Sequence, residues 1–255
     1  MTAVLEASGI AVNFGGVKAV DNVDISVQDG QLVGLIGPNG AGKTTFIDAI
    51  TGFVPAHGRV ELDGRDLAKL SAHNRARQGL VRTWQSIELF DDLTVGENLS
   101  VSAYRPGLRA TLKELLWKPE TAFATVEETL ELLGLADVVN ASPSDLPQGQ
   151  RKLVGVARAL AARPRLLLLD EPAAGLDTTE SQDLGQRLRS VVDAGLSMLL
   201  IDHDMGLVLS ICDYIFVLDF GVIIAEGTPE AIRSDPRVIS AYLGSSASEI
   251  TAEAS

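Results

Sequence analysis

The sequence predicts an α/β fold in which a helix-covered parallel sheet follows an antiparallel β subdomain. The first third is β-rich, because short apolar or alternating runs separated by glycine-bearing turns occur at 10–14, 20–27 and 60–62. From residue 150 onward, helical and strand patterns alternate, which is typical of parallel strands joined by helices. A glycine-rich loop, 37–45, lies between a predicted strand and a predicted helix.

The other elements follow in chain order. Residues 32–36 are apolar and predict a buried strand, and 45–50 predict the helix that follows the loop. Residues 91–150 predict an inserted helical lobe, because apolar positions recur at helical spacing in 95–104, 112–117 and 122–133.

The carboxyl half continues the alternation. The sequence predicts helices at 150–161 and 179–194 and strands at 166–169, 198–201, 214–218 and 222–225, the last two joined by a turn at Phe220 and Gly221. The segment 245–255 is small and polar, which predicts a disordered tail after a single domain of 1–244.

Composition and charge exclude several classes of function. The chain has 255 residues, 46% of them hydrophobic, which is enough for one large α/β domain. It shows no apolar run of membrane-spanning length and no signal peptide, and its single cysteine, Cys212, is expected in the core, so we expect a cytoplasmic protein. The net charge of −13 argues against binding to nucleic acid or directly to anionic lipid.

The glycine-rich loop fits the phosphate-binding pattern of two glycines five positions apart followed by Lys and Thr. Its backbone N–H groups would surround phosphate oxygens, Lys43 would reach the β- and γ-phosphates, and the Thr44 hydroxyl would bind Mg²⁺. The sequence therefore predicts a nucleotide site built from Gly37, Pro38, Asn39, Gly40, Ala41, Gly42, Lys43, Thr44 and Thr45.

A second signal follows the four leucines at 166–169, which predict a strand buried on both faces. Asp170 and Glu171 come at the carboxyl end of this strand, where open α/β sheets bind ligands. Asp170 would hold Mg²⁺, and Glu171 would accept a proton from the attacking water or orient it.

Together, the loop, the leucine-rich strand with Asp170 and Glu171, and the segment 174–177 resemble the ATP-binding subunit of an ABC transporter, in the expected order from about residue 4 to 244. The resemblance implies a P-loop ATPase with ATP and Mg²⁺ as cofactors. It implies that Gln85 touches Mg²⁺ and the attacking water, and that His203, beside Asp202 and Asp204, donates to the γ-phosphate.

Four further residues acquire roles from the resemblance. Asp177 is expected at the dimer seam. Phe14 lies where an aromatic ring stacks on adenine, although a phenylalanine of the core explains the residue nearly as well. The signature segment 146–150 has Pro147 and Gln148 where the family has Ser and Gly, so Gly149 and Gln150, at a helix start, would bind the ATP of a partner subunit.

The subgroup is indicated by the segments 12–16, 79–85, 170–176 and 235–244, which look like those of ATP-binding subunits of branched-chain amino acid importers, except that Trp84 replaces the usual Phe. Related subunits serve urea, amide and aromatic-acid uptake, and lipopolysaccharide export. The implied partners are membrane permeases, a second ATP-binding subunit, identical or different, and indirectly a solute-binding protein. The resemblance also implies that the protein is located at the cytoplasmic face of the cell membrane, held there by the permeases.

The segment 86–90 then has two explanations, a groove for a cytoplasmic helix of the permease or packing of Leu89 and Phe90 between the lobe and the sheet. A non-transport ABC ATPase is disfavoured because the chain has one phosphate loop, no sustained heptads and an acidic balance. A small kinase or GTPase would leave Asp170, Glu171 and the signature segment unexplained.

Overall fold

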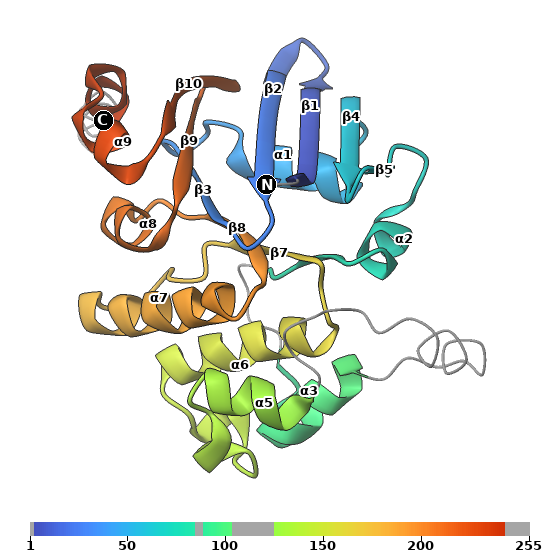
Figure 1. The fold of residues 1–255 in the computed structure, drawn as a ribbon, viewed down its shortest axis with the longest axis vertical. Coiled ribbons are helices and arrows are strands. Elements are labelled where there is room, and N and C mark those ends of the chain that lie inside the picture. Colours follow the sequence, from blue (N-terminus) through green and yellow to red (C-terminus); the bar gives the residue numbers. More distant parts are fainter. Residues whose placement is uncertain (1–2, 85–88, 104–124, 243–255) are drawn as a thin grey trace.

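The computed structural model describes residues 3–84, 89–103 and 125–242. They form two sheets and a helical lobe, with the antiparallel sheet and the lobe on opposite sides of the parallel sheet (Figure 1). The predicted fold class is confirmed. The predicted helix at 112–117 and the tail at 245–255 lie outside the described residues.

The antiparallel sheet has the strand order β2-β1-β4-β5. Its strands are longer than the sequence predicts, because the register of β1 shifts between Ala7 and Ile10, where Gly9 has φ 60°, and this shift interrupts the alternation. The bounds are Ala3–Phe14 for β1, Val17–Gln28 for β2, His57–Leu62 for β4 and Arg65–Asp66 for β5.

The second sheet has the order β10-β9-β3-β8-β7-β6, and all its strands run parallel except β10, which pairs antiparallel with β9. This confirms the predicted parallel core and the predicted final pair of strands. The short strand β6 was not predicted, because three residues are too few to show a period. The bounds are Leu32–Ile36 for β3, Leu80–Arg82 for β6, Leu166–Asp170 for β7, Ser197–Ile201 for β8, Tyr214–Asp219 for β9 and Val222–Gly227 for β10.

The four leucines of β7 show how the layers join. Leu166 and Leu168 belong to the core shared with the antiparallel sheet and α1, whereas Leu167 and Leu169 belong to the core shared with the helices on the other face. Alternate side chains of a strand point to opposite faces, so β7 is buried on both sides as predicted. Helix α1 (Lys43–Thr51) therefore lies between the two sheets (Figure 1).

Helix α2 (Ala72–Arg77) lies beside α1, where Arg75 donates to the carbonyls of Ala49 and Ile50. The remaining helices cover the other face of the parallel sheet and build the lobe. They are α3 (Val95–Ala103), α5 (Val126–Leu132), α6 (Gln148–Ala161), α7 (Thr178–Asp193), α8 (Met205–Ile211) and α9 (Pro229–Ser234), with short 3-10 turns at Ala136–Val138 and Pro143–Asp145. Helices α3, α5 and α6 contact one another and form the lobe (Figure 1). In the described part of the chain, no helix combines the length and apolar character needed to cross a membrane.

Cys212 is buried at the end of α8, as the sequence predicts. Burial raises the pKa of its thiol, so the residue is an unreactive part of the core.

Candidate nucleotide site

The phosphate loop joins the end of β3 to the start of α1, as predicted. Gly37 and Gly42 have φ angles of 154° and 105°, and a Cβ atom on either would overlap the carbonyl oxygen of Leu218 or of Ala19. Glycine is required at both positions because any side chain there would force the neighbouring backbone away. The N–H of Gly221 donates to the carbonyl of Ala41 at 2.9 Å, so the β9–β10 turn supports the loop from outside.

Lys43 is the first residue of α1 and is buried. Its Nζ donates to the carbonyl oxygens of Gly37 at 2.6 Å and Pro38 at 2.9 Å, so the lysine is folded back into its own loop. Burial lowers the pKa of Lys43, and the charges of Glu171, Asp202 and Asp170 oppose this shift. Carboxylates from the ends of β7 and β8 therefore lie within electrostatic reach of the loop lysine.

Asp170 and Glu171 lie at the carboxyl end of β7 and differ in burial and backbone conformation. Asp170 is the last strand residue, is buried, and pairs with the guanidinium of Arg82. Glu171 has a left-handed φ of 47°, and its N–H donates to the carbonyl of Ile201 at 2.8 Å. A glutamate in this conformation stores backbone strain, which proteins retain mainly at functional sites.

His203 comes just after β8 and faces the glutamate. Its Nδ1 lies 3.8 Å from Oε2 of Glu171 and 3.5 Å from Oδ1 of Asp202. Asp202 is fully buried and accepts hydrogen bonds from the N–H groups of His203 and Asp204, which fixes this turn. Asp204, the other acidic neighbour of His203 in the sequence, caps α8 by accepting from Leu207 N.

The signature segment starts α6 two residues earlier than predicted. Pro147 is the residue that precedes the helix, so the helix begins at Gln148 and places Gly149 and Gln150 in its first turn. Asp177, expected at a dimer seam, caps α7 by accepting from the N–H groups of Thr179 and Glu180. These residues are available to a second subunit, and their role across an interface stays a prediction.

Three other predicted site residues have different outcomes. Phe14 ends β1 with 53% of its surface exposed, so the alternative that it fills the core is wrong, while stacking on adenine stays a prediction. Gln85 lies outside the described residues. Thr44 is exposed at the start of α1, where its hydroxyl is accessible to a ligand of the loop.

Arg82 was not predicted. Its side chain is 4% exposed and donates both to Asp170 on β7 and to Asp48 on α1. The only signal in the sequence was an arginine in the apolar stretch before Gln85, and arginines are rarely buried unless they are paired.

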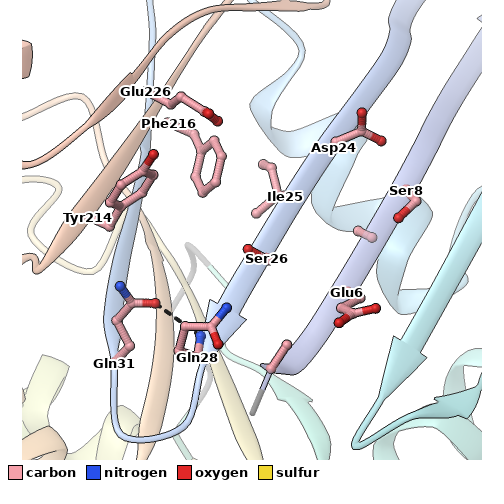
Figure 2. Close-up of a pocket in the computed structure, with 12 residues that line it drawn as sticks. Glu6, Ser8, Asp24, Ile25, Ser26, Gln28, Gln31, Tyr214, Phe216 and Glu226 are labelled. Atoms are coloured by element: carbon pink, nitrogen blue, oxygen red, sulfur yellow. Dashed lines mark hydrogen bonds between the residues drawn. The ribbon is translucent and has the colours of Figure 1, made fainter. Parts of the chain in front are cut away.

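A pocket of about 470 Å³ lies elsewhere, between β1 and β2 on one side and β9 and β10 on the other (Figure 2). Figure 2 shows Glu6, Asp24 and Glu226 around it together with the rings of Tyr214 and Phe216. Gln31, which lines this pocket, comes before the start of β3, whereas the phosphate loop follows the end of that strand. This pocket is therefore separate from the nucleotide site.

The end of the described chain also reaches the phosphate loop. Residues 236–242 are helical, and Tyr242 packs against the core. Burial raises the pKa of Tyr242 to about 12, and the neighbouring backbone of Gly37 opposes the shift. The tyrosine thus packs the carboxyl-terminal helix against the core beside the loop.

Tyr242 is expected to make stability depend on alkaline pH. Because its folded pKa lies above the ordinary value of about 10, its contribution is present below pH 10 and is lost as the pH rises toward 12. Relative to Tyr242→Phe, the parent should lose about 1 kcal/mol of unfolding free energy between pH 9 and pH 11. Urea unfolding of both proteins at these pH values measures the difference, and a constant difference would contradict the prediction.

The strand–loop–helix, the strained glutamate and the facing histidine define the class of the protein, a P-loop nucleoside triphosphatase. The chain belongs to the ABC transporter family, whose model matches residues 20–174. A second model, described as a branched-chain amino acid ATP-binding cassette transporter, matches residues 222–248. The chain is thus an ATPase of a transport system.

Several proteins are similar to the chain over almost its whole length. The high-affinity branched-chain amino acid transport ATP-binding protein BraF of Pseudomonas aeruginosa is 43% identical, with 94% of this chain and 98% of the relative covered. LivG of Salmonella typhimurium, which has the same description, is 40% identical with the same coverage. The lipopolysaccharide export protein LptB of Haemophilus influenzae is 35% identical, covering 94% of this chain and 97% of the relative.

Solved structures agree with this assignment. The ADP conformation of an ATP-binding cassette from an ABC transporter is 33% identical and superposes with a TM-score of 0.81, covering 96% of this chain and all of the other. The nucleotide-free form of an ATP-binding cassette from an ABC transporter is also 33% identical, with a TM-score of 0.80 and 94% and 98% covered.

Proposed function

We propose that this chain binds and hydrolyses ATP to power the import of branched-chain or related amino acids. The observation that carries the proposal is the convergence of Lys43, Glu171 and His203 from three elements that sequence places far apart. The similarity to BraF and LivG along nearly the whole chain supports the choice of cargo.

Each residue has a chemical task in this proposal. The loop N–H groups and Lys43 bind the phosphates, for which Lys43 Nζ must leave the two carbonyls that it now contacts. Glu171 orients the attacking water and accepts its proton. His203 donates to a γ-phosphate oxygen, which offsets negative charge in the transition state.

Thr44 and Asp170 would hold Mg²⁺, with Gln85 as a further oxygen ligand. A hydroxyl and a carboxylate are the hard oxygen donors that Mg²⁺ prefers, and proteins bind this ion through one or two carboxylates together with the phosphates of a substrate. When bound, the ion would neutralise charge on the β- and γ-phosphates.

We further propose that two ATP-binding subunits, identical or different, act as a pair. Gly149 and Gln150 in the first turn of α6 would contact the γ-phosphate of the nucleotide held by the partner, because the N–H groups of a helix start bind anions. Permeases would hold the pair at the cytoplasmic face of the membrane and receive cargo from a solute-binding protein. The net charge of −13 is consistent with attachment through proteins rather than through anionic lipid.

The contact with the permease is expected near Phe90. Leu89 is partly buried and packs against the core, whereas Phe90 is 47% exposed next to Arg158. Leu89 therefore fits the packing explanation, whereas Phe90 fits a contact with the permease. Residues 86–88 of the same segment lie outside the described residues.

Phe90→Glu should leave thermal unfolding and ATP binding unchanged but reduce recovery of the chain with membranes, because an exposed apolar contact is replaced by a charge. Leu89→Arg should instead lower stability by about 2–5 kcal/mol, as expected for a charge introduced into packed surroundings. Flotation of membranes measures the association. Normal membrane recovery of Phe90→Glu would place the contact elsewhere.

The cargo is tested by uptake. Source cells that lack the gene for this chain should lose uptake of labelled leucine, isoleucine and valine, and the parent gene should restore it while Glu171→Gln should not. Urea, amides and aromatic acids are assayed in parallel. Restored uptake of one of these compounds alone would overturn the proposed cargo and keep the ATPase.

A further inference from the structure

The buried guanidinium of Arg82 forms a fork between two carboxylates. One arm donates to Oδ1 of Asp48 on α1, and the other donates to Oδ2 of Asp170 on β7 at 2.6 Å. The Arg82 side chain is 4% exposed and that of Asp170 is 7% exposed, so this pairing takes place almost out of contact with water. Charge-assisted hydrogen bonds of this kind are strong and directional.

The fork joins the two elements that carry the proposed magnesium ligands. Thr44 and Asp48 are four residues apart on α1, so they lie on the same face of the helix, one turn from each other. Asp170 is the last residue of β7. Arg82 therefore connects the Thr44 face of α1 to the Asp170 end of β7, one helical turn away from Thr44.

Two aromatic rings help to hold the guanidinium of Arg82 in place. The ring of Trp84 lies 4.3 Å from the guanidinium carbon, and the ring of Phe53, just beyond α1, packs edge-on against Trp84 at 4.9 Å between centroids. A cation held over an aromatic face is stabilised and loses rotational freedom. The fork thus has a defined geometry.

The two carboxylate oxygens of Asp170 differ in their contacts. Among the described residues, Arg82 is the only donor to this carboxylate, and it uses Oδ2. In this inference Oδ1 is the oxygen of Asp170 that would bind a metal ion or its bound water.

We propose that Arg82 is a positioning residue for the divalent metal, which holds Thr44 and Asp170 at the spacing that Mg²⁺ requires, with Asp48 as its second anchor. The inference rests on the proposed function, because it presumes that the chain binds Mg²⁺ with ATP. Mg²⁺ tolerates little departure from octahedral geometry, so a change in the spacing of its ligands lowers its affinity.

The test measures metal dependence of binding, without turnover. A fluorescent ATP analogue is titrated into the purified chain, first in EDTA and then at increasing Mg²⁺ concentrations. Asp48→Ala removes one arm of the fork and leaves the Arg82–Asp170 pair, whereas Asp48→Asn keeps an oxygen acceptor. Arg82→Lys keeps the charge but not the fork. Glu61→Ala is the matched control, because it removes a carboxylate paired with Arg59 in the other sheet.

The Mg²⁺ concentration at half-maximal binding should rise roughly 10- to 100-fold in Asp48→Ala and Arg82→Lys, as for other partners of metal ligands. It should rise less in Asp48→Asn and stay constant in Glu61→Ala. Binding in EDTA should be the same in all variants. Equal weakening with and without Mg²⁺, or an unchanged Mg²⁺ midpoint, would overturn the inference.

A failure of the proposed function would give a different result from a failure of this inference. A parent protein that binds the analogue equally well with and without Mg²⁺, or not at all, would contradict the nucleotide and metal assignment itself. A cooperative thermal unfolding transition of Asp48→Ala would show that the variant is folded, so that a signal lost through unfolding is not mistaken for lost metal affinity.

Discussion

Glu171→Gln is expected to slow ATP hydrolysis by roughly 10²–10⁴-fold, the usual contribution of a positioned general base. Glutamine has the same shape and can take the same left-handed turn against Ile201, but it does not accept a proton. ATP binding should persist, because the phosphates are held by the loop and Lys43. The ATP-bound pair of subunits should therefore accumulate.

Steady-state turnover, nucleotide binding and size-exclusion chromatography with ATP measure these three effects. Glu230→Gln is a matched control, because Glu230 is exposed in the first turn of α9 and should leave turnover unchanged. Full turnover by Glu171→Gln would show that another group takes the proton, and His203, at 3.8 Å from Glu171, would be the first to examine.

Gly149→Asp is expected to abolish hydrolysis while leaving nucleotide binding to the isolated chain intact. The carboxylate would stand at the start of α6, where it would repel the γ-phosphate held by the partner subunit. The phosphate loop of the same chain is built from other elements and is unaffected. The effect therefore separates binding from turnover.

The structure supplies the controls for this variant. A Cβ atom at position 149 would lie 3.4 Å from Oε1 of Glu180, an ordinary contact, so Gly149→Ala should fold and retain most of its activity. Gly149→Asn has the size of aspartate without its charge and should lose less turnover than Gly149→Asp. If Asn and Asp were equally inactive, size rather than charge would explain the loss. Unchanged turnover of Gly149→Asp would place the signature segment outside the site.

Much of the site could be predicted because its chemistry is local in sequence. The glycines, Lys43 and Thr44 form one continuous loop, and their spacing alone indicates a phosphate site. Asp170 and Glu171 were recognised because they follow four leucines, and β7 is indeed buried on both faces. The roles assigned to Gly149 and Gln150 came from a family resemblance, and a single subunit does not test them.

Long-range contacts were beyond prediction. Arg82 interacts with Asp48 and Asp170, which lie 34 and 88 residues away, and nothing in the local pattern indicates either partner. The beginning of α8 was not recognised, although Asp204 caps this helix. Phe14 was compatible with two explanations until its exposure excluded the core.

Three features could be predicted from the sequence because each depends on the spacing of neighbouring residues: the phosphate loop, the leucine-rich strand that ends in two carboxylates, and the α/β architecture. The folded chain was needed to show that His203 faces Glu171, that Lys43 lies among carboxylates from two strands, and that Arg82 joins α1 to β7. Strand order in a parallel sheet brings distant segments to one edge, and that order is set by the packing of both faces, which no local pattern records.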